Sequence, residues 1–204
     1  MAVAFTQLIP IQEMAPGSVA AIRLQVTNAL VALAARELNM TPDQLVVRDL
    51  RPVEDLQLYG SGTTAATIDD WIFTTAATTA TGFVTISGDK TMGDQRYVAL
   101  YGVRELRFTE LLRSSVTVQT LVWLPDAVSL LKINVGGGDK VIWDTTKIQC
   151  YPDAPVAITP GAVVIPQNAS FNISIYKAQG VASAIVRMIL EGVVVEPRGK
   201  VISP

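Results

Sequence analysis

The apolar residues in the first part of the chain follow a helical period over one segment. Four of them recur at spacings of four and three, which places them on one face of an amphipathic helix: Ile22, Val26, Leu30 and Leu33. Ser18 precedes this stripe and can cap the helix, while Thr41 and Gln44 fit a capping box that starts a further short turn. We therefore predict a helical segment over residues 18–44.

Residues 1–17 have a different pattern, because apolar and polar types alternate around Pro10 and the stretch ends at Pro16-Gly17. A Pro-Gly pair is typical of a turn and not of a packed helix. The pattern predicts an extended arm over residues 1–17, which can lie on a neighbouring molecule. At the other end of the sequence, we expect residues 198–204 to form a C-terminal tail.

From residue 45 onwards, short runs rich in Val, Ile, Thr and aromatic residues are interrupted by Gly, Pro, Asn and Asp, which is typical of strands and turns. Residues 170–177 alternate apolar and polar types, as a half-buried antiparallel strand requires. Because about eight to ten such runs follow one another without helices between them, the fold class is mainly β. We predict an antiparallel β-sandwich over residues 45–197, and a jelly roll fits the strand count. The candidate strands are residues 71–75, 83–88, 96–103, 115–124, 129–135, 140–145, 147–151, 162–166, 170–177 and 184–197.

The stretch "VGGGDK" at residues 135–140 contains three consecutive glycines followed by Asp139 and Lys140. A phosphate-binding loop of the Walker type would need a different spacing of its glycines and a helix after it. Here a second strand pattern follows instead, so the glycines are typical of a hairpin connection. We predict a turn with Asp139 and Lys140 on its solvated side.

Composition narrows the functions that the chain can have. Charged residues make up only 17% of the chain, against roughly 25% in ordinary soluble domains, so we expect apolar surface to be buried against partners. The net charge of −2 supplies no basic surface for nucleic acid, and we expect no direct nucleic-acid binding. The chain has no histidine, which removes the usual catalytic triads and imidazole metal sites.

The remaining candidates for chemistry have simpler structural explanations. The acid pairs Asp69-Asp70 and Glu54-Asp55 are interpreted as solvated surface charge, although a carboxylate-based hydrolase stays open. Cys150 has no histidine beside it and is expected to be an inert thiol. We therefore predict no catalytic residue, no metal site and no cofactor, and expect no small-molecule substrate.

Three tryptophans could form a sugar-binding platform, because aromatic rings stack on the faces of pyranoses. Each of them lies inside an apolar run, so packing in a core or an interface is the preferred interpretation. They are Trp71, Trp123 and Trp143.

The start of the sequence lacks the positive region of a secretory signal. The most apolar helical stretch, residues 24–35, is flanked by Arg23 and Arg36 and is shorter than the roughly 20 apolar residues that span a bilayer. We expect neither a signal peptide nor a transmembrane segment.

The combination of an apolar arm, a helix, a β domain containing "ITPGAVVIPQNASFNISIY" and "RMILEGVVVEPRG", and the tail "KVISP" resembles a single jelly-roll structural protein, a capsid or cement protein, of an icosahedral bacteriophage or related virus. The resemblance covers residues 45–197. It implies a non-enzymatic protein that forms or cements a shell within a virion assembled in the host cytoplasm. The implied partners are further copies of the chain and other virion proteins, and some members of this class enclose an inner membrane.

A sandwich of low charge with apolar termini gains stability by oligomerising. We predict that neighbouring subunits bury five apolar side chains of the two termini: Phe5, Leu8, Ile11, Val201 and Ile202. Deletion of residues 1–16 should then impair assembly and leave the β domain folded. The alternative function is a carbohydrate- or receptor-binding β-sandwich module, on a phage tail or a cell surface.

Overall fold

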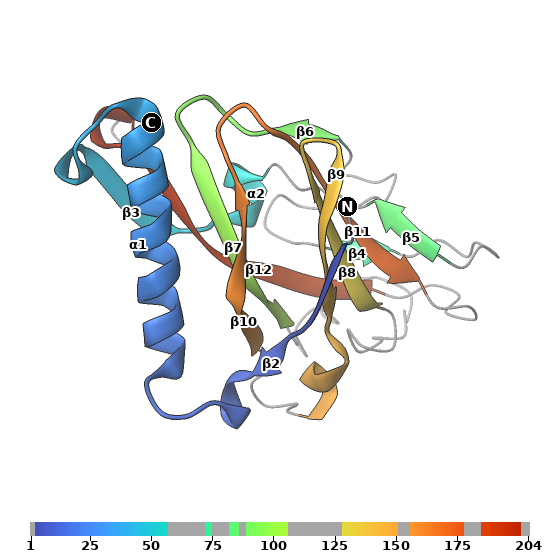
Figure 1. Cartoon of the computed structure of the whole chain (residues 1–204). Coiled ribbons are helices and arrows are strands. Elements are labelled where there is room, and N and C mark those ends of the chain that lie inside the picture. Colours follow the sequence, from blue (N-terminus) through green and yellow to red (C-terminus); the bar gives the residue numbers. More distant parts are fainter. Residues whose placement is uncertain are drawn as a thin grey trace, which may run out of the picture.

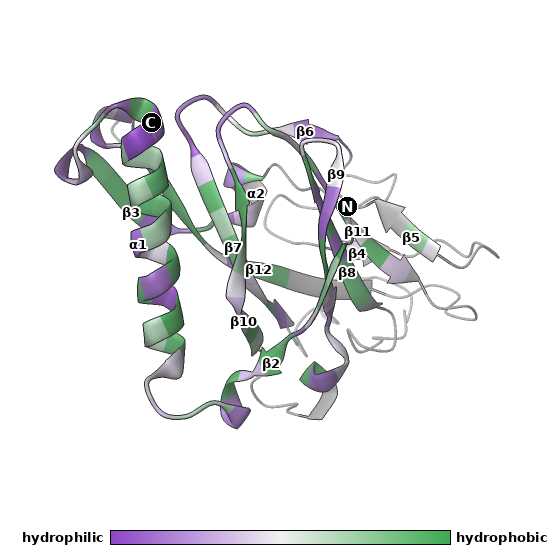
Figure 2. Ribbon diagram, viewed as in Figure 1, coloured by the Kyte–Doolittle hydropathy of each residue, from purple (hydrophilic) through white to green (hydrophobic). Residues whose placement is uncertain are grey.

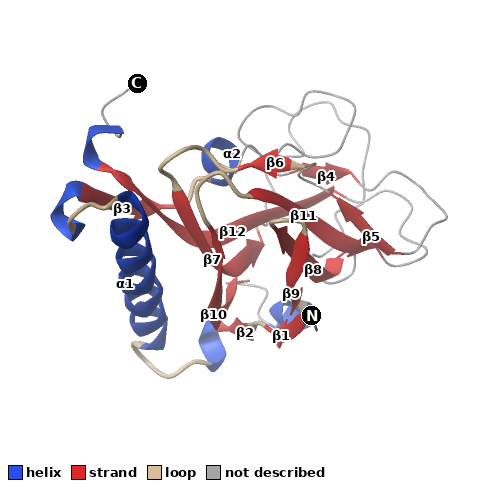
Figure 3. Ribbon diagram, turned by 45° about the horizontal axis from the view of Figure 1, so that its top comes forward, coloured by secondary structure: helices blue, strands red, loops and turns tan. Residues whose placement is uncertain are grey.

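A computed structural model of the chain describes residues 3–56, 72–74, 82–85, 89–105, 128–150, 156–177 and 185–200. These residues form two β-sheets, here called sheet A and sheet B, and the long helix α1 (Ser18–Leu38) lies against the outer surface of sheet B (Figure 1). A second view shows the same arrangement, with α1 at one side of the molecule and the N-terminus beside β1 (Figure 3). The prediction of a mainly β protein is confirmed.

Sheet A contains six strands, five of which follow one another across the sheet. In spatial order these five are β1 (Ala4–Gln7), β9 (Gly138–Asp144), β8 (Val128–Val135), β11 (Ser170–Lys177) and β5 (Gly82–Thr85), and β6 (Lys90–Thr91) also pairs with β11.

Sheet B also contains six strands. Its order is β2 (Ile9–Pro10), β10 (Val156–Ile165), β7 (Tyr97–Glu105), β12 (Ile185–Pro197) and β3 (Leu45–Asp49), and β4 (Ile72–Thr74) also pairs with β12. The pairs in both sheets are antiparallel except β1–β9, which is parallel. The prediction of an antiparallel sheet therefore holds outside the N-terminal strand.

The alternation of side chains along the strands of sheet B produces two separate cores. On β7, Val98 and Leu100 face sheet A, whereas Tyr97, Ala99 and Tyr101 face α1. Neighbouring residues of a strand point to opposite faces, so a strand that is covered on both sides is apolar along its whole length. This double coverage explains the continuous apolar run of β7.

Helix α1 packs on sheet B through Val26, Leu30 and Ala34, which are buried, and Figure 2 shows hydrophobic and hydrophilic residues interspersed along it. The predicted cap is wrong, because Gly17 occupies the N-cap position with a left-handed φ of 84° and Ser18 is already helical. By length and composition alone, this 21-residue helix is apolar enough to cross a membrane, a test that core helices also pass.

The N-terminal arm packs into the β-sandwich of its own chain. Its residues form β1 at the edge of sheet A and β2 at the edge of sheet B, followed by the short 3-10 helix η1 (Ile11–Glu13). Leu8 lies between the two strands, donates its backbone N–H to Asp144 O (3.0 Å) and is fully buried in the core between the sheets. The arm therefore joins the two sheets along one side of the sandwich.

The remaining short elements are α2 (Pro52–Asp55), η2 (Pro42–Gln44), η4 (Thr146–Cys150) and η5 (Arg198–Lys200). The predicted capping box is present, since Thr41 donates its backbone N–H to Gln44 Oε1 (2.9 Å). The strand predicted at residues 147–151 is wrong, because residues 147–150 belong to η4, where Thr146 N–H donates to Asp144 Oδ1 (2.9 Å) and starts a turn. The strand predicted at residues 115–124 lies outside the described residues.

The glycine-rich stretch forms the turn of the β8–β9 hairpin, as predicted. Gly136 and Gly137 have φ values of 65° and 75°. Positive φ at both central positions is the geometry of a tight hairpin turn, and glycine adopts it without steric cost. The side chain of Asp139, just after the turn, accepts a hydrogen bond from Asn134 Nδ2 (3.1 Å).

Candidate functional site

Two groups of polar side chains are candidates for a function, and the first is a buried cluster at one end of sheet B. The cluster consists of two arginines and two acids that alternate in charge: Arg48, Asp55, Arg96 and Glu196. Asp55 has a fully buried side chain, and the side chain of Glu196 is 5% exposed. Arg48 lies on β3, Asp55 on α2 and Glu196 on β12, and Arg96 directly precedes β7.

Every acid of this cluster is bound by more than one donor. Arg48 donates Nη1–H to Asp55 Oδ2 and Nε–H to Glu196 Oε1, both at 2.8 Å. Arg96 donates Nε–H to Glu196 Oε2 (3.2 Å), and the Arg51 backbone N–H donates to Asp55 Oδ2 (2.8 Å). The hydrogen bond with Asp55 raises the pKa of Arg48 above its ordinary value.

The hydrogen bonds to both carboxylates limit the chemistry that the cluster can perform. The carboxylates of Asp55 and Glu196 already accept charge-assisted hydrogen bonds on their oxygens, which leaves them engaged within the protein and not available to a substrate. The cluster is electrically balanced and fixes α2 against the strands. We interpret it as structural. The prediction that Glu54-Asp55 is solvated surface charge is wrong for Asp55, which the sequence does not distinguish from its exposed neighbour Glu54.

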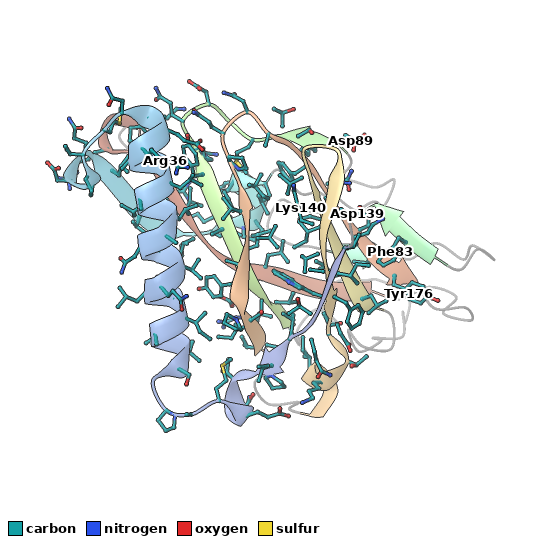
Figure 4. All side chains as sticks on the ribbon, in the orientation of Figure 1. Arg36, Phe83, Asp89, Asp139, Lys140 and Tyr176 are labelled. Carbon is teal, nitrogen blue, oxygen red and sulfur yellow. The ribbon has the colours of Figure 1, made fainter. Side chains whose placement is uncertain are left out.

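The second candidate is the outer face of sheet A, defined as the surface of sheet A that points away from sheet B. Because Leu131, Val141 and Ile173 face the core, their neighbours along the strands face outwards. Figure 4 shows five labelled residues of this surface on the side of the molecule away from α1: Phe83, Asp89, Asp139, Lys140 and Tyr176.

Aromatic and charged groups meet on this face. Phe83 and Tyr176 pack edge to face with 5.7 Å between their ring centroids. Lys132 Nζ lies 4.8 Å from the centroid of the Phe83 ring and 3.6 Å from Asp139 Oδ2. Phe83 remains 37% exposed. An exposed aromatic pair beside hydrogen-bonding side chains is suited to contact with a partner surface.

The predicted interface residues are in different environments. Phe5 is 63% exposed on β1, where it is in register with Ile142. Leu8 is fully buried within its own domain, so the prediction that neighbouring subunits bury it is wrong. It lies between β1 and β2, where the core between the two sheets already shields it from water. Ile11 packs partly buried against the core under α1. Val201 and Ile202 lie outside the described residues.

Trp143, one of the three candidate platform residues, is fully buried in the core between the sheets. The expected core packing is confirmed for Trp143, while Trp71 and Trp123, as well as Asp69 and Asp70, lie outside the described residues. Among the described residues, no group of three or more acidic or cysteine side chains is placed to hold a metal ion.

Comparison of the chain with protein-family models finds no match, and comparison with curated proteins finds no similar sequence. The function therefore has to be argued from the fold and from the two candidate sites.

Proposed function

We propose that the chain is a non-enzymatic structural protein of a virus particle, which forms or cements an icosahedral shell through contacts between subunits. The observation that carries this proposal is the order in which the strands pair. Along the chain, β8 pairs with β9, β7 with β10, β5 and β6 with β11, and β3 with β12.

These pairs are nested, like one long hairpin that has been rolled up. The pairs β12–β7 and β11–β8 then join the rolled hairpin into two sheets. Such winding is typical of a jelly roll, in which eight strands form two Greek keys. The strand order thus supports a jelly roll as the finer description of the β-sandwich.

Jelly rolls occur in viral shells, in lectins and in cupins. An enzyme that binds a metal through imidazole groups needs histidine, and this chain contains no histidine. The buried Arg48–Asp55–Arg96–Glu196 cluster is saturated and offers no free acid or base. These points favour a structural role over an enzymatic one.

Several surface features suit a subunit that contacts other subunits. β1 is an edge strand with the exposed Phe5, and the outer face of sheet A carries further exposed aromatic surface. Edge strands and exposed apolar groups are common sites of association. We therefore propose copies of the chain and other virion proteins as partners, in a virion assembled in the host cytoplasm, with no direct contact to nucleic acid.

Multi-angle light scattering of the purified protein over a range of concentrations tests this proposal. We expect a large assembly of defined mass, or a smaller oligomer that grows into one as the concentration rises. A protein that stays monomeric at every concentration and ionic strength would contradict the structural role.

The second candidate function, a carbohydrate- or receptor-binding module, is favoured by the Phe83–Tyr176 pair. Aromatic rings beside amide and carboxylate groups are also suited to sugars. Glycan-array binding by the wild-type protein that is lost in Tyr176→Ala, while Arg36→Ala on α1 binds normally, would favour this module over a shell protein.

A further inference from the structure

A row of four polar side chains crosses the outer face of sheet A from β9 to β6. Asn134 is in register with Asp139 on one side and with Asn172 on the other. Asn172 Nδ2 in turn donates to Asp89 Oδ1 (2.8 Å), beside the first residue of β6. The row therefore runs carboxylate, amide, amide, carboxylate across neighbouring strands.

The charged groups at the two ends of the row differ in their bonding partners. At the β9 end, Asp139 is paired with Lys132 (3.6 Å) and with the Asn134 amide (3.1 Å). Lys140 follows it, is exposed, and has no ion-pair partner among the described residues. At the β6 end, Asp89 is exposed and is bound by an amide but by no cation of the described part of the chain. Among the described residues, one end thus has a cation and the other an anion without an ion-pair partner.

This distribution is self-complementary. A two-fold axis parallel to the strands, passing between β8 and β11, would turn the row of one copy over the row of a second copy in the opposite order. The β9 end then lies over the β6 end of the partner, and each such contact occurs twice, as in every isologous interface. Near the axis the two amides, Asn134 and Asn172, meet the same pair of amides.

We propose that a second copy of this chain docks face to face on the outer face of sheet A about this two-fold axis, so that Lys140 of each copy pairs with Asp89 of the other. Amides both donate and accept hydrogen bonds, so the centre of the row can bind its own copy. The same rotation brings β9 over β5 as well, because β5 and β6 both lie beside β11, and so places the exposed Phe83 within the contact. This inference rests on the proposed shell function and names one contact within it.

The alternative position for this contact, the outer surface of sheet B, is already occupied. Helix α1 covers β7, β10 and β12 there through its own buried stripe. In the described part of the chain no helix covers sheet A in the same way. Among the described residues, α1 therefore prevents a face-to-face contact at the usual sheet spacing of about 10 Å on sheet B, and no helix prevents it on sheet A.

Charge reversal tests the proposal. Lys140→Glu and Asp89→Lys should each turn two attractive contacts into repulsive ones and weaken self-association by about tenfold. The double variant restores opposite charges at both contacts and should associate like the wild type. A 1:1 mixture of the two single variants should also recover, because the mixed dimer then has two opposite-charge pairs. Sedimentation velocity over a dilution series measures all four samples.

Arg36→Glu is the matched control, since Arg36 is an exposed charge on α1 at the other side of the molecule (Figure 4). Its association should equal that of the wild type, and circular dichroism should show every variant folded. Association that is unchanged by both single reversals would overturn this inference and leave the shell proposal standing, whereas a monomeric wild type would contradict the shell proposal itself. Glycan binding that the reversals abolish without a change of mass would assign the face to a carbohydrate and also overturn it.

Discussion

The residues of the buried cluster are held by charges that come from distant parts of the chain. Arg48 and Glu196 are 148 positions apart, and Arg96 and Glu196 are 100 apart. A buried ion pair contributes little net stability when it is complete, but it is costly to break because the remaining charge stays buried without a partner. The cluster therefore favours this particular pairing of β3, β7 and β12 over alternatives.

Asp55→Ala should lower the free energy of unfolding by about 3–5 kcal/mol, because it leaves Arg48 and Arg96 without their shared carboxylate in a buried site. Glu54→Ala is the matched control: its side chain is 63% exposed, and it should change the free energy by less than about 0.5 kcal/mol. Urea denaturation followed by circular dichroism measures both. Equal effects of the two substitutions would show that the cluster is not structural.

Gly192 lies on β12 where its pairing with the neighbouring strand β7 shifts register. A Cβ atom at this position would be 2.6 Å from Ala99 O and 3.0 Å from Leu50 Cδ2. Gly192→Ala should therefore shift the backbone of β12 and destabilise the domain by about 1–3 kcal/mol. Gly93→Ala, which meets no atom within 4 Å, is the control. Equal melting temperatures of the two variants would contradict the close packing of Gly192 against the Ala99 backbone.

Tyr101 gives the domain a dependence on alkaline pH. Burial raises the pKa of its hydroxyl, because the charged form is disfavoured under α1. As the pH rises, Tyr101 therefore loses its proton in the unfolded chain before it does so in the folded protein. The contribution of the neutral, buried hydroxyl to the free energy of unfolding is complete below pH ~10 and is lost as the pH rises above that value. Tyr101→Phe should reduce the loss of unfolding free energy between pH 8 and 11 in urea titrations, and an unchanged slope would exclude this contribution.

At the scale of elements, the N-terminal arm has two kinds of residue that the sequence alone does not separate. Leu8→Ala should lower the free energy of unfolding by about 2–5 kcal/mol, since it leaves a cavity between the sheets. Phe5→Ala, at a side chain that is 63% exposed, should leave stability nearly unchanged and weaken assembly. Chemical denaturation and light scattering on the same samples separate the two effects.

The arm also changes the expected result of truncation. Deletion of residues 1–16 removes β1, β2 and Leu8 from the two sheets, so we now expect it to destabilise the domain as well as to impair assembly. A truncated protein as stable as the wild type would show that β1 and β2 are dispensable for the fold.

The sequence predicts those elements whose signals are local. The alternation in residues 170–177, the glycines at 136 and 137 and the stripe of Val26 and Leu30 each report on their own segment, and β11, the β8–β9 turn and α1 follow from them. Asp55 and Leu8 depend on partners that the fold brings from elsewhere. No local pattern distinguishes a buried Asp from the exposed Glu before it, which is why the buried cluster was not predicted.

At the scale of the whole molecule, the two broad surfaces of the sandwich are unlike. Sheet B is covered by α1, while the outer face of sheet A is polar and aromatic. Among the described residues only sheet B is covered by a helix, so sheet A is the surface that can contact a second sheet directly. This difference between the two surfaces is why we propose the two-fold contact on the face with Lys140 and Asp89.

The nested strand order has a consequence for the timing of folding. β12, the last of the described strands along the sequence, lies between β7 and β3 in sheet B. Until β12 has been synthesised, β3 has no neighbour to pair with and both acids that bind Arg48 cannot be in place together. Contacts between residues so far apart in sequence form slowly. Sheet B therefore cannot close before residues 185–197 have left the ribosome, and until then β3 and β7 keep unpaired edges that could bind other chains.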